Sequence, residues 1–341
     1  MSSLKIGTAV ANSGQKAEGF VIVGENDQLG FARGQIRIPV LIANGASPGP
    51  RLVLTAGQHS GEYIGTEAAI RLVDGLDPAA LQGTVIAFPV LNIYGFLEKV
   101  PYVCPYDGLN MNRLWPGDHG GTIGQRIVHA LWESAILTAD TVIDMHGGDF
   151  PESQSDYAIF FATADAVSTT ESERLARLFG FKYVRRSSEE EGGRETGSLA
   201  RIFAEKTRKP AVVTEVGDSG CVDAERLNSN MTGLTNVMKG LGMLAGDASP
   251  MRGDQLVMMS RTAVVAGAAG LCRLHVRIDQ SVERGQCIAT VCDLHGHALE
   301  ELVSPVDGAV VQLFRQAATS PGHIVAKVAS LAPCTSMEGR N

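Results

Sequence analysis

The feature that most constrains the fold is a series of short apolar segments that alternate with helical stretches between residues 51 and 244. The segments 52–56, 84–91, 141–145, 157–161 and 211–214 are mostly apolar, which indicates strands buried on both faces. Helices are expected between them, near 61–74, 122–138, 171–179, 198–208 and 223–244. This alternation predicts an α/β protein with a mixed, mainly parallel sheet covered by helices.

Both ends of the chain have a different pattern. Residues 1–45 contain strand-like runs at 21–23 and 36–42, and we expect this β segment to pack on a larger α/β domain spanning 46–249. Beyond residue 250 the helical periodicity ends, and short apolar runs alternate with glycine turns. This predicts a small all-β module over 250–330 and a tail over 331–341.

Charge and cysteine usage exclude several classes of protein. The chain carries 29 basic and 37 acidic residues, a net charge of −8, which argues against binding nucleic acid or an anionic membrane. No apolar run reaches the ~20 residues that span a bilayer, and no signal core follows Met1. None of the six cysteines forms a C-x-x-C pair, so we expect free thiols. A cytoplasmic protein is predicted, and the sequence leaves a homo-oligomer open.

Four ionisable residues fall just after predicted strands. They are His59, Glu62, His146 and Glu215. Ligands of open α/β sheets bind outside the carboxyl ends of the strands. His59 and Glu62 are three positions apart at a strand-to-helix turn, and a distant His146 would complete a His₂Glu set with one position open for water, as catalytic zinc requires.

Each of these residues also has a structural interpretation. H-x-x-E alone is a weak motif that often marks a surface histidine and a helix-start glutamate. Glu215 follows an apolar strand, where a carboxylate is costly unless it is paired or functional. It is therefore either a partner in a buried salt bridge or a general base beside a metal-bound water.

Two polar loops carry further candidates. Asn112 and Arg113 lie in a Gly- and Pro-bounded loop, 107–117, and the arginine is either solvated or a fork for a carboxylate. The charged segment 185–194, which includes Glu189–Glu191, is interpreted as a solvated loop, with a lid over the site as the alternative.

Taken together, these motifs resemble the succinylglutamate desuccinylase/aspartoacylase family, within the zinc carboxypeptidase-like superfamily. The matching pieces are Gly57-Gln58-His59-Ser60-Gly61-Glu62, Asp107-Gly108…Asn112-Arg113…Pro116-Gly117, Asp144-Met145-His146 and Thr214-Glu215-Val216-Gly217. The module with Ser304-Pro305-Val306-Asp307-Gly308 resembles the biotinyl/lipoyl-like barrel found at the C-terminus of such proteins.

The resemblance implies one Zn²⁺ per chain held by His59, Glu62 and His146, with Glu215 as catalytic base. It implies that Asn112 and Arg113 bind the substrate carboxylate, and that the reaction is hydrolysis of the amide of an N-acyl amino acid. Relatives often carry an arginine upstream of the 107–117 loop. Between Gly95 and Asn112 the only basic residue here is Lys99, and Tyr102 or Val103 stands near the place of that arginine. Either zinc and another donor stabilise the oxyanion, or the substrate differs from that of aspartoacylase proper.

Two alternative functions remain. A metallocarboxypeptidase would use the same metal ligands and the same Asn-Arg pair, and a non-catalytic small-molecule-binding protein would share the fold. A biotinyl or lipoyl carrier is not expected, because the 304–308 turn offers no lysine. The acyl group and the amino-acid side chain of the substrate cannot be predicted from these residues.

Overall fold

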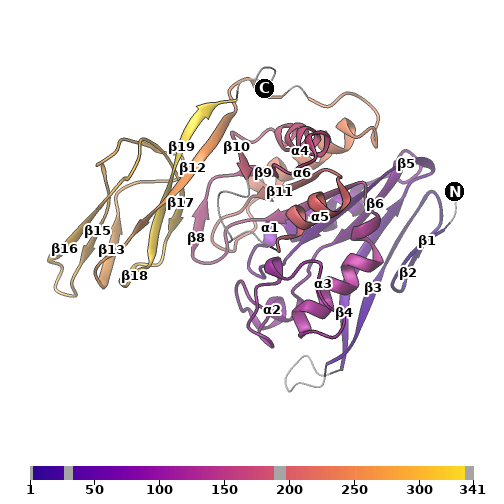
Figure 1. The fold of residues 1–341 in the computed structure, drawn as a ribbon, viewed down its shortest axis with the longest axis horizontal. Coiled ribbons are helices and arrows are strands. Elements are labelled where there is room, and N and C mark those ends of the chain that lie inside the picture. Colours follow the sequence, from indigo (N-terminus) through magenta and orange to yellow (C-terminus); the bar gives the residue numbers. More distant parts are fainter. Residues whose placement is uncertain (1–2, 27–33, 188–196, 250, 335–341) are drawn as a thin grey trace.

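The computed structural model of the chain describes residues 3–26, 34–187, 197–249 and 251–334. Helices cover a long central sheet, and a second β body extends from one end of it (Figure 1). The strands before residue 250 are β1 (Leu4–Ile6), β2 (Ala9–Ala11), β3 (Gln15–Asn26), β4 (Gly34–Asn44), β5 (Ser47–Ala56), β6 (Gln82–Phe88), β7 (Thr141–His146), β8 (Glu152–Gln154), β9 (Tyr157–Phe161), β10 (Tyr183–Ser187) and β11 (Ala211–Glu215). The helices are α1 (Tyr63–Gly75), α2 (Ile93–Glu98), α3 (Ile123–Ser134), α4 (Ala166–Leu178), α5 (Leu199–Thr207) and α6 (Ala224–Gly240).

The central sheet is mixed, as predicted. Strands β6, β5, β7 and β11 are parallel neighbours in that order. On one side β4 and then β3 continue the sheet antiparallel. On the other side β9 is antiparallel to β11 and parallel to β10.

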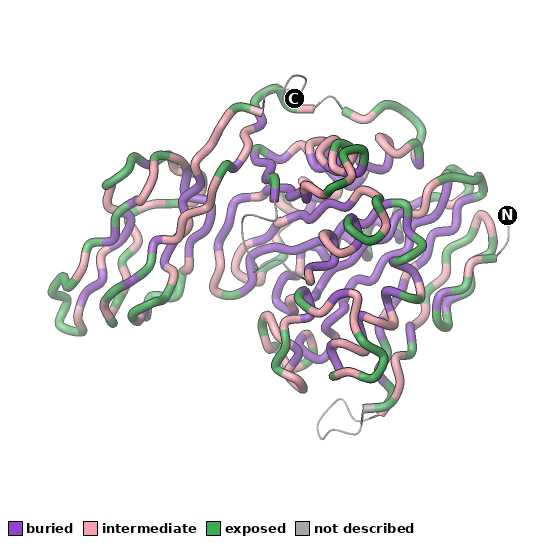
Figure 2. Tube along the Cα trace, in the orientation of Figure 1, coloured by how far each residue is buried: buried purple, intermediate pink, exposed green. Residues whose placement is uncertain are grey.

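Hydrophobic cores lie on both faces of the sheet, which explains the uninterrupted apolar strands. Side chains of α3 and α5 share one core with Val142, and side chains of α1, α4 and α6 share the other with Ile143. Successive residues of β7 therefore face opposite cores. Figure 2 shows these central strands as almost continuously buried.

Several boundaries differ from the sequence expectation. The sequence analysis does not predict strand β10, because Arg185 and Arg186 suggest a charged loop there. In the structure these residues belong to the strand, and Arg185 is buried in the sheet. Helix α4 begins at Ala166 rather than near 171. Asp165 caps this earlier start, because its side chain accepts a hydrogen bond from the backbone nitrogen of Ser168. Residues 188–196, and so the proposed solvated loop or lid there, lie outside the described residues.

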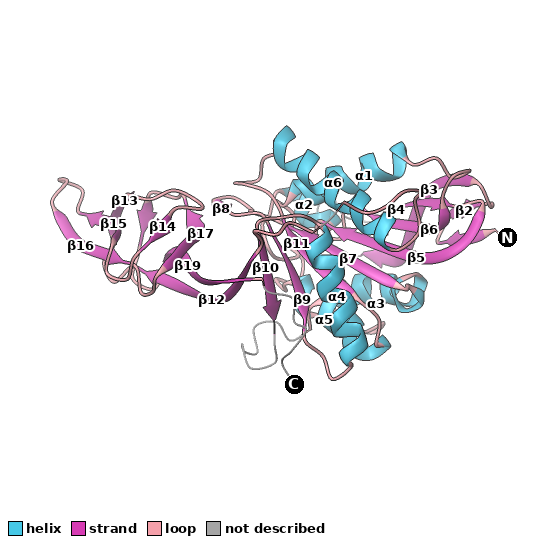
Figure 3. Ribbon diagram, turned by 90° about the horizontal axis from the view of Figure 1, so that it is seen from above, coloured by secondary structure: helices cyan, strands magenta, loops and turns pink. Residues whose placement is uncertain are grey.

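The C-terminal strands form the second β body seen in Figure 3. They are β12 (Leu256–Val265), β13 (Gly270–Leu274), β14 (Ser281–Val282), β15 (Cys287–Cys292), β16 (Ala298–Val303), β17 (Gly308–Phe314), β18 (Ala318–Thr319) and β19 (Ile324–Pro333). A four-stranded sheet in the order β16-β15-β13-β18 shares a core with β12, β17 and β19. β12 also pairs with β10, and β17 pairs with β8, so this body is joined to the central sheet.

The end of the chain is also ordered further than expected. Residues 331–333, which the sequence places in the tail, continue β19 and pair with β12 from Leu256 to Met258. The mixed pattern of small and apolar residues there gave no sign of this pairing.

Candidate metal centre and active site

His59 and Glu62 lie in the turn between β5 and α1. The backbone nitrogen of Glu62 donates to the carbonyl oxygen of His59 over 3.3 Å, which closes the turn directly before α1. His146 is the last residue of β7, the parallel neighbour of β5. The carboxyl ends of these two strands therefore bring the three side chains to one edge of the sheet.

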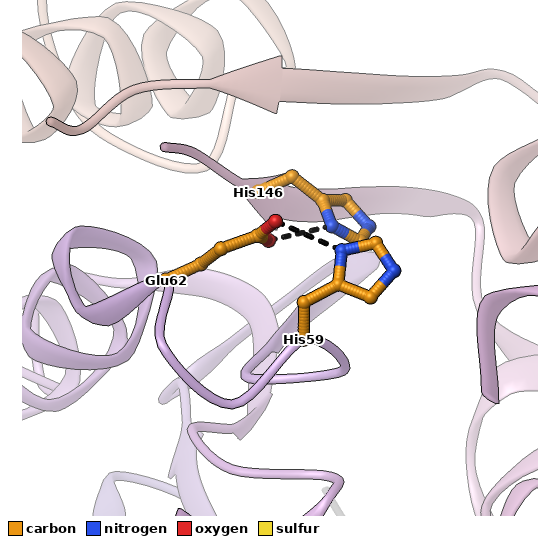
Figure 4. A group of neighbouring side chains, drawn as sticks. All are labelled: His59, Glu62 and His146. Carbon is orange, nitrogen blue, oxygen red and sulfur yellow. Dashed lines mark hydrogen bonds and ion pairs between the residues drawn. The ribbon is translucent and has the colours of Figure 1, made fainter. Parts of the chain in front are cut away.

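The three side chains converge on a common point (Figure 4). Nδ1 of His59 lies 2.8 Å from Glu62 Oε1, and Nδ1 of His146 lies 2.8 Å from Glu62 Oε2. One ligand atom from each residue lies within 4.8 Å of the others. This donor set suits a divalent cation such as zinc, which accepts two imidazole nitrogens and a carboxylate and keeps a fourth position for water.

The electrostatics of the group favour a cation. Burial alone would favour a neutral Glu62, but the imidazoles of His59 and His146 outweigh it and lower the pKa of Glu62 to about 2. Burial likewise opposes a charged His146, but Asp144 and Glu62 raise the pKa of His146 well above its ordinary value. The buried carboxylates thus favour positive charge at the cluster. Protons and a metal ion compete for the same ligand atoms to supply it.

The outer nitrogen of each imidazole is held by an oxygen acceptor. Nε2 of His59 lies 3.2 Å from Oδ1 of Asn110, and Nε2 of His146 lies 3.1 Å from Oδ2 of Asp144. When Nε2–H donates to these oxygens, Nδ1 is the ring nitrogen that faces Glu62 at the common point, where a metal ion can replace its proton. Such outer acceptors fix the tautomer and the ring orientation of metal-binding histidines.

Asp144 belongs to a buried network that sequence reasoning did not identify. Its Oδ1 accepts from Oγ1 of Thr55 and Nε2 of Gln58, each over 2.7 Å. Gln58 in turn accepts from Nε1 of Trp115 over 2.8 Å. The network fixes the carboxylate that orients His146. Its one sequence signal was a charged residue inside the apolar strand 141–145.

Asp144→Asn is expected to weaken zinc binding about 10–100-fold, the usual effect of changing a residue that orients a metal ligand. The amide keeps the size of the side chain but removes the charge that makes His146 a better donor. Competition with a zinc indicator measures the affinity. Asp140→Asn is the matched control, because Asp140 precedes the same strand at its opposite end and is exposed. Equal affinities in Asp144→Asn and wild type would contradict the role given to Asp144.

Gly61 lies between His59 and Glu62 in the turn, and no residue with a side chain fits at this position. A Cβ atom at this position would overlap the carboxylate of Asp149. The order Ser60-Gly61 in this turn is therefore matched to Asp149, which follows His146 by three residues.

Glu215 lies beside His146. It ends β11, the parallel neighbour of β7, and is paired in register with His146, so both side chains project from the same face of the sheet. Its Oε2 accepts from Nε2 of Gln154 over 2.9 Å. Burial raises the pKa of Glu215, although the nearby His146 acts in the opposite direction. A carboxyl group with a raised pKa can both accept and return a proton.

Asn112 and Arg113 have different environments. Asn112 is buried, its Oδ1 accepts from the backbone nitrogen of Leu199 over 3.0 Å, and its Nδ2 lies 3.2 Å from Nε2 of His146. Arg113 is exposed, and its Nη1 donates to the carbonyl oxygen of Asn112 over 2.6 Å. The structure thus joins Asn112 to the metal cluster and leaves Arg113 at the surface.

Residues from the C-terminal strands also reach the site, which the sequence did not indicate. Nε2 of Gln312 in β17 donates to Glu152 over 2.9 Å. Burial, together with the charge of Arg261, lowers the pKa of Lys327 in β19 to about 8, and the carboxylates of Glu152 and Glu215 act against this shift. The second β body therefore contributes charge next to Glu215.

Comparison with known proteins identifies the family. A family model for the succinylglutamate desuccinylase/aspartoacylase catalytic domain matches residues 48–241, more than half of the chain. The chain belongs to this family. The resemblance to this family inferred from the sequence motifs is confirmed.

Relatives of this desuccinylase/aspartoacylase family member cover nearly its whole length. The N-alpha-acetyl-L-2,4-diaminobutyric acid deacetylase of Halomonas elongata is 28% identical over 311 residues, covering 90% of this chain and 89% of that protein. The product-bound ectoine utilization protein EutE (DoeB) of Ruegeria pomeroyi matches with a TM-score of 0.82 and 23% identity, over 92% of this chain and 94% of that one. A succinylglutamate desuccinylase/aspartoacylase of Rhodobacter sphaeroides matches with a TM-score of 0.80 and 23% identity, over 92% and 95% of the two chains. The two structural matches establish the fold.

In the described part of this family member, no helix has the length and apolar character needed to cross a membrane.

Proposed function

We propose that this protein is a zinc-dependent amidohydrolase that removes the acyl group from an N-acyl amino acid or a related small N-acyl compound. One observation carries the proposal: the His59–Glu62–His146 cluster lies beside Glu215, which is in register with His146 on the neighbouring strand. The similarity to the Halomonas elongata deacetylase, over 90% of this chain, supports an acylated amino acid as the substrate class.

In this proposal His59 Nδ1, His146 Nδ1 and the Glu62 carboxylate hold one Zn²⁺ per chain. When bound, zinc supplies a water of lowered pKa and polarises the scissile carbonyl. Glu215 takes the proton of the attacking water and then returns it to the leaving amine. Its burial beside the metal site suits both steps, because its raised pKa allows the protonated form to donate.

A substrate screen on zinc-loaded protein tests the function. N-α-acetyl-L-2,4-diaminobutyrate, other N-acetyl amino acids and N-succinyl amino acids are compared with short peptides. We expect equimolar carboxylic acid and free amine from at least one N-acyl amino acid. Hydrolysis confined to peptides would instead support a metallocarboxypeptidase, and zinc binding without any hydrolysis would support a non-catalytic binding protein.

We further propose that Arg113 binds the α-carboxylate of the substrate through its planar fork, with Asn112 steadying the same group. Arg113 is exposed on the loop next to the buried Asn112, so it can meet a substrate that enters from solvent. Asn112 in turn links this loop to His146.

An α-amide analogue of the substrate is expected to react about 10- to 150-fold more slowly, because the guanidinium loses a charge-assisted hydrogen bond. Arg113→Lys keeps the charge but not the fork, so its kcat/KM should lie between wild type and Arg113→Ala. Measuring kcat/KM for acid and amide substrates in the three proteins tests this. If wild type hydrolyses both equally well, Arg113 does not bind a carboxylate.

We also propose that 46–249 is a zinc-carboxypeptidase-like catalytic domain with the 1–45 β segment packed on it. The 250–330 module is proposed to be a barrel-sandwich that shapes access to the site and carries no prosthetic group. The pairing of β8 with β17 supports the role of the module in shaping access, because β8 carries Glu152 next to the site.

A further inference from the structure

The hydroxyl of Tyr102 is a buried donor beside the metal cluster that the steps above do not use. It is shielded from solvent and makes no hydrogen bond of normal geometry with any described residue, although the carboxylate of Glu152 lies close enough to interact with it. Buried tyrosine hydroxyls usually find a partner. Without a well-aligned acceptor among the described residues, this hydroxyl can donate to an acceptor that the substrate brings.

The backbone of Tyr102 is held in a conformation that bulky residues seldom adopt. Its φ is 62°, in the left-handed region, and such conformations persist where the surroundings enforce them, often at active sites. Hydrogen bonds fix the chain on both sides. Ser60 Oγ donates to the carbonyl oxygen of Val100, and Nδ2 of Asn92 donates to that of Val103 over 3.0 Å. The first of these bonds ties the Tyr102 loop to the turn that carries His59 and Glu62.

The ring of Tyr102 packs on the ring of His59, with centroids 5.2 Å apart and planes tilted by 55°. An ordinary tyrosine hydroxyl has a pKa of about 10, so it is protonated at neutral pH and can donate.

Other donors near the cluster are less suited to meet a carbonyl oxygen. Lys99 and Arg113 are exposed.

We propose that the Tyr102 hydroxyl donates a hydrogen bond to the oxyanion that develops on the scissile carbonyl. This inference rests on the proposed function. As water adds to the carbonyl carbon, Glu215 takes its proton, the π pair of the carbonyl moves to oxygen, and the hydroxyl of Tyr102 stabilises that charge while keeping its own proton. Collapse then re-forms the carbonyl and breaks the C–N bond, and the amine leaves with the proton from Glu215.

Tyr102→Phe removes only the hydroxyl. We expect kcat on N-α-acetyl-L-2,4-diaminobutyrate, or on the best substrate of the screen, to fall about 10²–10³-fold, the usual effect of losing one oxyanion donor. KM should stay within about threefold of wild type, because the interaction strengthens in the transition state rather than in substrate binding. Zinc content should be unchanged. Tyr106→Phe is the matched control, since the Tyr106 hydroxyl donates to Glu98 rather than facing the cluster.

Binding of methylphosphonate to the zinc-loaded proteins gives a second measurement that needs no turnover. This small tetrahedral anion resembles the reacting carbon with its charged oxygens. Calorimetry should show affinity about 10-fold or more weaker in Tyr102→Phe than in wild type or Tyr106→Phe, because a hydrogen bond to a charged group is lost.

The two measurements separate this inference from the proposed function. If wild type hydrolyses no N-acyl amino acid, the proposed function fails, and methylphosphonate affinity alone decides the role of Tyr102. If wild type is active, a Tyr102→Phe kcat within about threefold of wild type overturns the inference, since oxyanion donors contribute far more. Equal methylphosphonate affinity in the two proteins also overturns it.

Discussion

Glu215→Gln is expected to retain zinc and to lose amide hydrolysis by about 10²–10⁴-fold, the usual contribution of a general acid–base group. The glutamine side chain has almost the same shape, and its oxygen can still accept the hydrogen bond from Gln154. The metal cluster should therefore stay intact while the proton acceptor is lost. Initial rates and elemental analysis on the same preparation measure both properties.

A carboxylate away from the site provides the control for Glu215→Gln. Glu205 pairs with Arg201 on the surface of α5, so Glu205→Gln should keep full activity. Wild-type turnover in Glu215→Gln would remove Glu215 from the mechanism. Loss of zinc together with activity would instead make Glu215 a structural support of the cluster.

The convergence of His59, Glu62 and His146 could be predicted because strand order and strand polarity determine it. His59 and His146 follow apolar strands whose periodicity is plain in the sequence, and parallel neighbours end at the same edge. Glu215 could be placed for the same reason, from a carboxylate at the end of an apolar strand. These inferences needed only local patterns and the rule for parallel sheets.

The residues that orient and surround the cluster could not be predicted in this way. Asp144 acts through contacts with Thr55 and Gln58, which depend on how strands β5 and β7 are registered. Tyr102 depends on a left-handed backbone in an irregular loop. Lys327 comes from the far end of the chain, and only the packing of β19 against the catalytic part brings it near Glu215.

The missed strand β10 has a related cause. Arginines in a sequence suggest exposure, because charged side chains are rarely buried without partners. Here Arg185 lies opposite Ile159 in the sheet, and its charge acts on Tyr157 and Lys327. The interactions that make its burial possible come from distant parts of the chain, so the local sequence does not reveal the strand.

Removing the metal is expected to abolish activity almost completely, and one equivalent of Zn²⁺ per chain should restore it. The proposed water activation depends on the cation, and the described cluster offers one set of three ligands. Dialysis against a chelator, followed by titration with zinc and measurement of initial rates, tests the stoichiometry. Activity that survives the chelator, in protein found free of metal by elemental analysis, would refute a zinc mechanism.

His146→Ala is the corresponding change in the protein itself. It removes one of three ligands, so zinc affinity should fall by more than the ~10–100-fold typical of residues that only orient a ligand, and activity should fall with it. His129→Ala is the matched control, because His129 lies on α3 and its ring faces His119, outside the cluster. A His146→Ala protein that binds zinc as tightly as His129→Ala would show that the metal is held elsewhere. Parallel loss of zinc and activity in His146→Ala alone would tie catalysis to the cluster at the ends of β5 and β7.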